Sequence, residues 1–394
     1  MLVGIKINNF ALLKDFKLGL GFQELLETKT NGQGSDLPSL KPLNVFIGQN
    51  ASGKSSFFEA LQFLRQTLSR DVQEAANLSR PGSYSDLVYS RKPGEYDLTF
   101  DLVLQKHKGY WLNYQLKISS DQNHRPYIAE ESCWSYDLAT PQNGSTCLLQ
   151  STLGEGKVLV DKAYQAFQLT EKKISVVHLY GRQTNCPDLV WLYNQITRFY
   201  CANFKNLPAK IKSKARTGGH KHLNRKLDNV ANVLYYLKKE KKQLFRQLQE
   251  DLDANLPKQS RIDLGQLDKL DNQGQIKLLL AYLIMADPRP LLAFDQPDSG
   301  LHYDLVDSLA LGLRDYVIHN PCSQIFISTH NVNLLEGFSP REVWSFDRLT
   351  DREGNDRVEA RYLADDRLVM AMYEEGVGLG SLWYSGYLDQ VTDA

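Results

Sequence analysis

The amino-acid sequence predicts an α/β fold that combines a buried, largely parallel sheet with an antiparallel β region. Short apolar runs are typical of strands buried on both faces, and they occur at 43–48, 291–295 and 324–329. Helical patterns accompany these runs, at 55–68, 272–286 and 302–318. Between about 83 and 180, short alternating segments separated by Gly, Asn and Pro predict antiparallel strands.

Taken in order, residues 2–20 alternate apolar and polar side chains and predict edge strands, and 21–42 are expected to be a surface loop. Strands are predicted at 96–104, 110–118 and 174–180, and residues 187–256 are expected to be helical. The predicted organisation is a mixed α/β core (1–75 and 263–394), an inserted antiparallel β subdomain (76–185) and a basic helical lid (186–262).

The overall composition is that of an ordinary globular protein and indicates no particular partner. The 394 residues contain 42% hydrophobic and 23% charged residues, so a large core is possible, and 46 Lys and Arg balance 46 Asp and Glu. Five scattered cysteines include no CxxC pair, which argues against a zinc site or a disulfide framework. The N-terminus lacks a long apolar run. We therefore expect a soluble, cytoplasmic protein without a membrane partner.

A glycine-rich loop lies between the strand at 43–48 and the helix at 55–68. It fits the pattern G-x-x-x-x-G-K-[ST], and the residues expected to bind nucleotide here are Gly48, Gln49, Asn50, Ala51, Ser52, Gly53, Lys54, Ser55 and Ser56. Backbone N–H groups of such a loop surround phosphate, and the following helix adds its positive N-terminal end. Lys54 would neutralise the β- and γ-phosphates, and the Ser55 hydroxyl would bind Mg²⁺. The alternative is a Gly/Ser-rich turn that matches by accident.

Two later strands end in residues that suit the same chemistry. The apolar strand at 291–295 ends in Asp295, whose carboxylate would hold Mg²⁺, although any buried strand can end in Asp. Another apolar strand leads into Ser328, Thr329, His330 and Asn331. A histidine there can sense the γ-phosphate, whereas a lone His at a strand end is more often structural.

Taken together, these segments resemble the SMC/RecF/OLD-like branch of ABC-type ATPases. Residues 5–10 resemble its opening strand, 43–61 its phosphate loop, 294–302 its Walker B and D-loop, and 328–331 its switch-histidine loop. The segment at 272–283 occupies the place of the signature motif. The resemblance implies an ABC-type P-loop ATPase head that binds ATP and Mg²⁺ in a head-to-tail dimer, in which Asn272 and Gly274 of one copy complete the site of the other. His302 falls where the branch often has histidine, and a helix-start role is the simpler interpretation.

Three residues depart from the family pattern. Ala51 replaces a usual glycine, Asn272 replaces the signature serine, and Gln296 replaces the glutamate that polarises the attacking water. Glutamine keeps the shape of glutamate but cannot accept a proton. Either the chain hydrolyses ATP slowly by nature, or Gln296 is an engineered replacement that traps ATP. The residues assigned to catalysis are thus Gln296, His330 and Lys54.

A strongly basic segment covers residues 202–246. Its 13 Lys and Arg against two acids (Asp228 and Glu240) give a net charge of +11, and the basic residues are Lys205, Lys210, Lys212, Lys214, Arg216, Lys221, Arg225, Lys226, Lys238, Lys239, Lys241, Lys242 and Arg246. Such a segment can neutralise nucleic-acid phosphates. It can equally be a solvated helical face or a dock for an acidic protein.

Three functions are compatible with these features. The first is an ATPase that acts as sensor or scaffold in a bacterial defence system and controls a separately encoded effector, as the resemblance to stand-alone members without a TOPRIM nuclease domain implies. The second is a RecF-like DNA-repair clamp that binds DNA in an ATP-dependent way. The third is a nucleotide-binding structural subunit with little hydrolysis.

Overall fold

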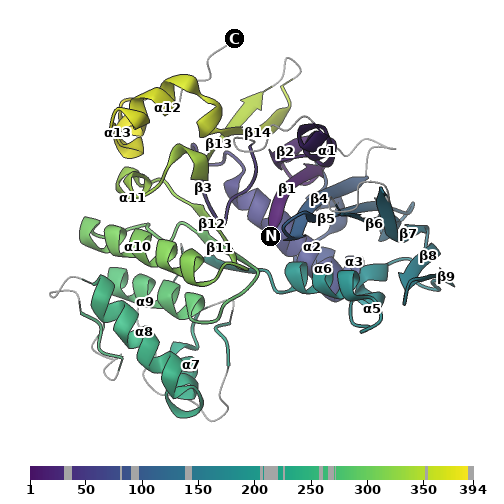
Figure 1. The fold of residues 1–394 in the computed structure, drawn as a ribbon, viewed down its shortest axis with the longest axis horizontal. Helices are drawn as coiled ribbons and strands as arrows, with labels where there is room; N and C mark the ends of the chain where they lie inside the picture. Colours follow the sequence, from purple (N-terminus) through teal and green to yellow (C-terminus); the bar gives the residue numbers. More distant parts are fainter. Residues whose placement is uncertain are drawn as a thin grey trace. The chain divides into compact units, whose positions relative to one another are not determined.

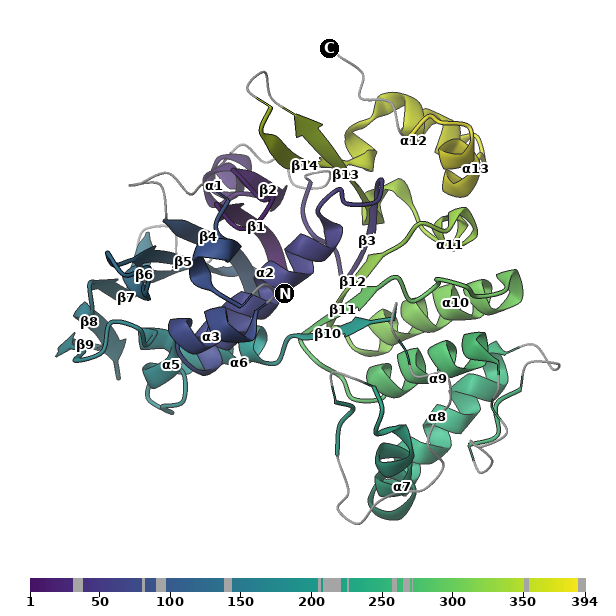
Figure 2. The same ribbon diagram turned by 180° about the vertical axis from the view of Figure 1, so that it is seen from behind.

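The computed structural model describes residues 1–30, 38–79, 82–89, 97–137, 144–204, 207, 221–224, 227–256, 261–264, 270, 272–350 and 354–388. The chain forms two compact units (Figures 1 and 2). The first unit comprises Met1–Lys41, Gln49–Phe199 and Phe346–Arg361, and the second comprises Pro42–Gly48, Tyr200–Ser345 and Tyr362–Ala394.

An eight-stranded antiparallel sheet is the centre of the first unit. Its strands, in spatial order, are β2 (Phe16–Gly19), β1 (Leu2–Asn8), β4 (Leu98–His107), β5 (Tyr110–Ser120), β6 (Pro126–Asp137), β7 (Ser145–Thr152), β8 (Glu155–Val160) and β9 (Ala163–Gln168). Neighbouring strands from β4 to β9 follow one another in the sequence, which is the pattern of a meander built from hairpins. The N-terminal β1 joins this sheet beside β4.

The helices of the first unit are α1 (Phe22–Thr30), α2 (Lys54–Ser69), α3 (Val72–Leu78), α4 (Tyr84–Leu87), α5 (Val176–Tyr180) and α6 (Pro187–Thr197). Aromatic side chains of helix α2 pack against strand β2 and against Phe10, which follows β1. The Phe57 ring lies 5.9 Å from Phe16, and the Phe63 ring lies 5.8 Å from Phe10. These buried pairs fix α2, and with it the loop from which α2 starts.

A parallel sheet is the centre of the second unit. Its strands, in spatial order, are β10 (Tyr200–Asn203), β11 (Leu291–Asp295), β12 (Gln324–Ser328), β3 (Leu43–Ile47) and β13 (Val343–Thr350). Every residue of β3, β11 and β12 is buried, as expected for strands covered on both faces. Strand β13 runs on into the first unit, where β14 (Asp356–Tyr362) follows it as the last strand of this sheet.

The helical elements of the second unit are α7 (Val230–Glu240), α8 (Lys242–Asn255), α9 (Gln273–Met285), α10 (Tyr303–His319), α11 (Val332–Glu336), η4 (Pro340–Glu342), η5 (Leu363–Asp365), α12 (Arg367–Glu374) and α13 (Leu379–Tyr384). Helices α7, α8, α9 and α10 are stacked in a row on one side of β11 and β12 (Figures 1 and 2). Helix α9 is buried on nearly all sides and shares one apolar core with its neighbours and with β11.

The structure confirms the predicted α/β class and the main strands and helices, and it corrects three local predictions. Residues 22–30 form helix α1 where a loop was expected. Residues 200–203 form strand β10 inside a stretch expected to be helical. Residues 176–180 form helix α5 where a strand was expected.

The last correction has a clear physical reason. Glu131 on β6 is buried, and its carboxylate accepts hydrogen bonds from Val176 N (2.6 Å), Val177 N (3.2 Å) and Ser175 Oγ (2.6 Å). A carboxylate at the first N–H groups of a helix satisfies them and favours the helical conformation. The β-branched residues of this stretch predict a strand, but this long-range contact outweighs their propensity.

The two compact units do not follow the predicted three-part division. Strands β1 and β2 lie in the sheet of the first unit, together with residues assigned to the inserted β subdomain. The residues assigned to the helical lid share the second unit with the strands Leu291–Asp295 and Gln324–Ser328. The division into core, β subdomain and lid stays a prediction.

Candidate functional site

The glycine-rich loop has the backbone conformation that its sequence predicts. Gly48 has φ 128° and Gly53 has φ 96°, both in the region that favours glycine. A Cβ on Gly53 would lie 2.6 Å from Val358 Cγ2, so close packing also excludes a side chain there. Ala51 has φ 63°, which explains why glycine is usual at this position. An L-residue in this conformation costs about 1–2 kcal/mol.

Lys54 is the first residue of helix α2 and is buried, with 5% of its surface exposed. Its Nζ donates to Gln49 O (2.8 Å) and to Ser52 Oγ (3.1 Å), so the ammonium group holds the loop around itself. Gly53, at the N-cap of α2, offers no side chain to cap the first turn. The loop therefore combines a fixed cation with a helix N-terminus, an arrangement that suits phosphate.

The carboxyl ends of three neighbouring parallel strands meet at one edge of the second unit's sheet. Asp295 at the end of β11 pairs with Ser328 on β12, and Ser328 pairs with Phe46 on β3. Thr329 N continues this alignment by donating to Phe46 O (3.1 Å). Gly48 follows β3 directly, so the glycine-rich loop leaves the sheet at the edge where Asp295 lies. Ligands of parallel α/β sheets bind at this edge.

The Asp295 carboxylate is buried and held from two sides. Ser328 Oγ donates to Oδ1 (2.6 Å), and Asn203 Nδ2 donates to Oδ2 (3.0 Å). Strand β10 brings Asn203 beside Asp295 through parallel pairing with β11. These contacts orient the carboxylate, as the supporting hydrogen bonds of a metal-binding carboxylate do.

Gln296 follows Asp295 in a left-handed backbone conformation, with φ 55°. Its backbone N–H is shared between Ser328 O (3.1 Å) and Ser328 Oγ (3.0 Å), which fixes the turn at the end of β11. The half-buried side chain makes no hydrogen bond to any residue that the structure describes. Backbone contacts thus determine the position of Gln296, and its amide group is available to a ligand.

A second buried carboxylate lies three residues further on. Asp298 Oδ2 accepts a hydrogen bond from Thr329 Oγ1 (2.8 Å), and Thr329 Oγ1 accepts one from Asn331 N (2.9 Å). Asp298 Oδ1 is buried without a hydrogen-bond partner in the described part of the chain. Burial raises the pKa of Asp298 to about 6, although the Thr329 hydrogen bond and the charge of Lys277 act in the opposite direction. Asp298 therefore positions the loop that carries His330.

The signature-like segment begins helix α9. Asn272 is the N-cap, and its Oδ1 accepts from Gly274 N (2.8 Å). A Cβ on Gly274 would lie 2.8 Å from Leu305 Cδ1, so packing against α10 favours glycine. Lys277, one turn later, donates from Nζ to Ser299 O in the turn after Asp298. Asn272 is exposed, so the start of α9 faces solvent while its remaining turns are buried.

Comparison with known protein families matches residues 43–122 and 178–336 to the family described as "AAA domain, putative AbiEii toxin, Type IV TA system". The match covers more than half of the chain. The chain belongs to this AAA ATPase family.

Several solved structures are similar to this chain. It is similar to an Smc head bound to the C-terminal winged-helix domain of ScpA (13% identity, 94% of this chain and 99% of that one, TM-score 0.48). It is also similar to the SMC head domain from Thermotoga maritima (10% identity, 91% and 97% coverage, TM-score 0.47). A dimeric ATP-binding cassette bound to ADP and Pi matches with 11% identity, 86% and 93% coverage and a TM-score of 0.35.

No curated protein matches the sequence of this AAA domain. Among the helices that the structure describes, none has both the length and the apolar character needed to cross a bilayer.

The donor groups of the AAA domain fit ATP and Mg²⁺. Loop N–H groups and the Lys54 ammonium suit phosphates, while the Ser55 hydroxyl and the Asp295 carboxylate are oxygen donors of the kind that Mg²⁺ prefers. His330 is exposed on the loop after β12, and His302 is the N-cap of α10. Sequence reasoning missed Asn203, Asp298 and the role of Ser328, because their partners lie far away in the sequence.

The basic segment is only partly described. Lys221, Lys238, Lys239, Lys241, Lys242 and Arg246 lie within the described residues. Lys205, Lys210, Lys212, Lys214, Arg216, Arg225 and Lys226 lie outside them. Helices α7 and α8 confirm the helical prediction for the second half of the segment, and nucleic-acid binding by the segment as a whole stays a prediction.

We expect the change Asp298→Asn to stabilise the protein at pH 7.5 but not at pH 4. The folded pKa of about 6 exceeds the ordinary value of 3.8, so the folded state binds more protons between these values. The free energy of unfolding therefore falls as pH rises through this window, by about 3 kcal/mol for two pKa units. Asparagine does not titrate and avoids this loss.

Denaturation of the nucleotide-free protein at pH 4, 5, 6 and 7.5 measures the effect. The exposed Asp307 on α10 provides a matched control, because Asp307→Asn should leave the profile of the wild type unchanged. Parallel pH profiles for Asp298→Asn and the wild type would contradict the role of the buried carboxylate.

Proposed function

We propose that this chain binds and hydrolyses ATP with Mg²⁺, and that it works as an ATP-dependent head-to-tail dimer. The observation that carries this proposal is the sheet edge where Asp295 pairs with Ser328 and Ser328 with Phe46, two residues before Gly48 opens the glycine-rich loop. Family membership supports the ATPase activity. The order of the sequence motifs assigns the residues: 48–56 bind the triphosphate, and Ser55 and Asp295 hold Mg²⁺.

Each remaining site residue has one role in this proposal. Lys54 neutralises phosphate charge, Gln296 orients the attacking water without accepting its proton, and His330 senses the γ-phosphate. Asn272 and Gly274 of a second copy complete the site. Asn272, at the start of α9, is exposed, and a helix N-terminus suits contact with a phosphate of the other subunit.

The biological role that we propose is a sensor or scaffold in a bacterial defence system, with a separately encoded effector. The family description names a toxin of a toxin–antitoxin system, which favours defence over DNA repair. Co-purification of a separate protein encoded beside this chain would support the role. DNA affinity that depends on salt and tightens with ATP would favour a repair clamp instead.

Light scattering after size-exclusion chromatography tests the dimer. We expect the mass of the protein to double in ATP and Mg²⁺, helped by Gln296, which should slow hydrolysis. The change Asn272→Asp keeps a side-chain cap on Gly274 N but places a negative charge against the partner's triphosphate. This variant should bind ATP with near-normal affinity and stay monomeric.

Asn272→Ser is the matched control, because serine also caps helices and adds no charge. It should dimerise like the wild type. If Asn272→Asp dimerises equally well, the signature segment does not face nucleotide in the dimer, and the head-to-tail arrangement is wrong.

A further inference from the structure

A small cavity lies in the second unit, beside the C-terminal end of α9 and against α7. Its volume is about 130 Å³. Tyr236 contributes an aromatic ring to the lining, and the aliphatic side chains that line the cavity are Leu223, Val233, Leu237, Leu244, Leu283, Ile284 and Ala286. An enclosed cavity of about 150 Å³ holds one benzene ring. This slightly smaller cavity opens to solvent beside the exposed Lys221 and Lys241, so it can receive one ring that protrudes in part, and not a larger molecule.

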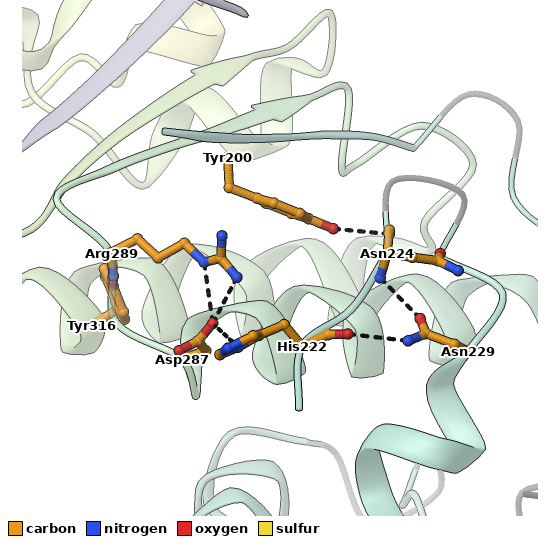
Figure 3. A network of polar contacts seen from close by, with 7 residues as sticks. All are labelled: Tyr200, His222, Asn224, Asn229, Asp287, Arg289 and Tyr316. Atoms are coloured by element: carbon orange, nitrogen blue, oxygen red, sulfur yellow. Dashed lines mark hydrogen bonds and ion pairs between the residues drawn. The ribbon is translucent and has the colours of Figure 1, made fainter. Parts of the chain in front are cut away.

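A polar network fixes one rim of the cavity (Figure 3). Asp287 Oδ2 accepts hydrogen bonds from Arg289 Nη2 (2.7 Å) and Nε (3.1 Å), and it lies 2.7 Å from His222 Nδ1. The Arg289 guanidinium lies over the Tyr200 ring, 4.7 Å from its centroid. Arg289 N also donates to Tyr316 Oη (3.3 Å). Asp287 is therefore already neutralised by its own neighbours.

The same network holds the short segment 221–224 against the cavity. Asn229 Nδ2 donates to His222 O (3.0 Å), while Asn224 N donates to Asn229 Oδ1 (2.9 Å). Tyr200 Oη donates to Asn224 O (3.2 Å), as Figure 3 shows. The segment is thus tied to β10 and to the start of α7, so this rim is formed before any ligand arrives, which lowers the cost of binding.

Two lysine side chains also line the cavity, and no acidic residue that the structure describes forms an ion pair with either of them. Lys221 and Lys241 are exposed, and neither ammonium group forms an ion pair or hydrogen bond with a residue that the structure describes. Asp287 is the one acidic residue among those that line the cavity. The rim therefore favours an anion, while the apolar interior favours a ring.

We propose that this cavity binds the base of an unpaired nucleotide, with Lys221 and Lys241 on the adjacent phosphates. A nucleotide has an aromatic base, which suits the apolar interior, and phosphates, which suit the cationic rim. The volume of the cavity limits it to one base. Stacking on an aromatic side chain such as Tyr236 is a usual way to hold an unpaired base. The nucleotide can belong to a single strand or be free. The proposal does not depend on the ATPase function.

Fluorescence anisotropy with a labelled twelve-nucleotide thymidine strand tests the proposal, with an abasic strand of equal length as the second probe. The wild type should bind the thymidine strand at least tenfold more tightly, because both strands carry the same phosphates and only one carries bases. Lys221→Ala combined with Lys241→Ala should weaken thymidine-strand binding at least tenfold. It should also reduce the dependence of affinity on salt.

Lys108→Ala combined with Lys172→Ala is the matched control. It removes the same charge from two exposed positions outside the basic segment and outside the cavity lining, and it should retain at least half of the wild-type affinity. Competition by thymidine monophosphate shows whether the ligand is a free nucleotide or part of a strand. If micromolar thymidine monophosphate displaces the labelled strand, the ligand is a free nucleotide; if it does not, the ligand is a strand. Equal binding of both strands, or equal losses in the two double variants, would overturn the proposal.

Discussion

Gln296→Glu should raise the ATP turnover of this chain by about 100- to 10,000-fold, the usual contribution of a positioned general base. Glutamine and glutamate have the same shape, and the backbone of Gln296 is fixed by Ser328 O and Oγ independently of the side chain. The substitution should therefore place a proton acceptor where an amide now lies, with little change in fold.

Phosphate release at saturating ATP and Mg²⁺ measures this effect. The lifetime of the ATP-bound dimer should shorten in parallel, since the added negative charge faces the γ-phosphate. Gln296→Ala is the control, because it removes the amide without supplying a base and should not accelerate hydrolysis. Equal turnover of Gln296→Glu and the original chain would remove the general-base role from this position.

Loss of ATP binding is the expected result of Lys54→Ala. We expect at least a hundredfold increase in Kd, which corresponds to about 2.7 kcal/mol. In the proposed site the buried ammonium group supplies charge to the phosphates, and in the structure it holds Gln49 O and Ser52 Oγ in the loop. Alanine removes both contributions. Titration of a fluorescent ATP analogue, with and without Mg²⁺, measures the affinity.

In the same assay, Ser55→Ala distinguishes the contribution of Mg²⁺ to ATP affinity from the contribution of the Lys54 ammonium group. It should keep the affinity measured without Mg²⁺ and lose the gain that Mg²⁺ provides. A melting temperature within a few degrees of the wild type would show that Lys54→Ala still folds. If folded Lys54→Ala bound ATP as tightly as the wild type, the glycine-rich loop would not be a nucleotide site.

Local sequence patterns were sufficient for the parts of the site that depend on neighbours in the chain. The strand at 43–47, the glycines at 48 and 53 and the helix from Lys54 form one continuous segment, so residue type and spacing predicted them correctly. Strands β11 and β12 were predictable because strands buried on both faces are continuously apolar. The end of β11 then placed Asp295 at the edge of the sheet.

Only the tertiary structure revealed which distant polar groups pair with one another. Asn203 contacts Asp295 across 92 residues, Asp298 contacts Thr329 across 31, and Glu131 caps helix α5 across 45. A local pattern describes which conformation a segment prefers and which face it buries. It does not describe which distant polar group will satisfy a buried carboxylate, because that partner is chosen by strand order and packing.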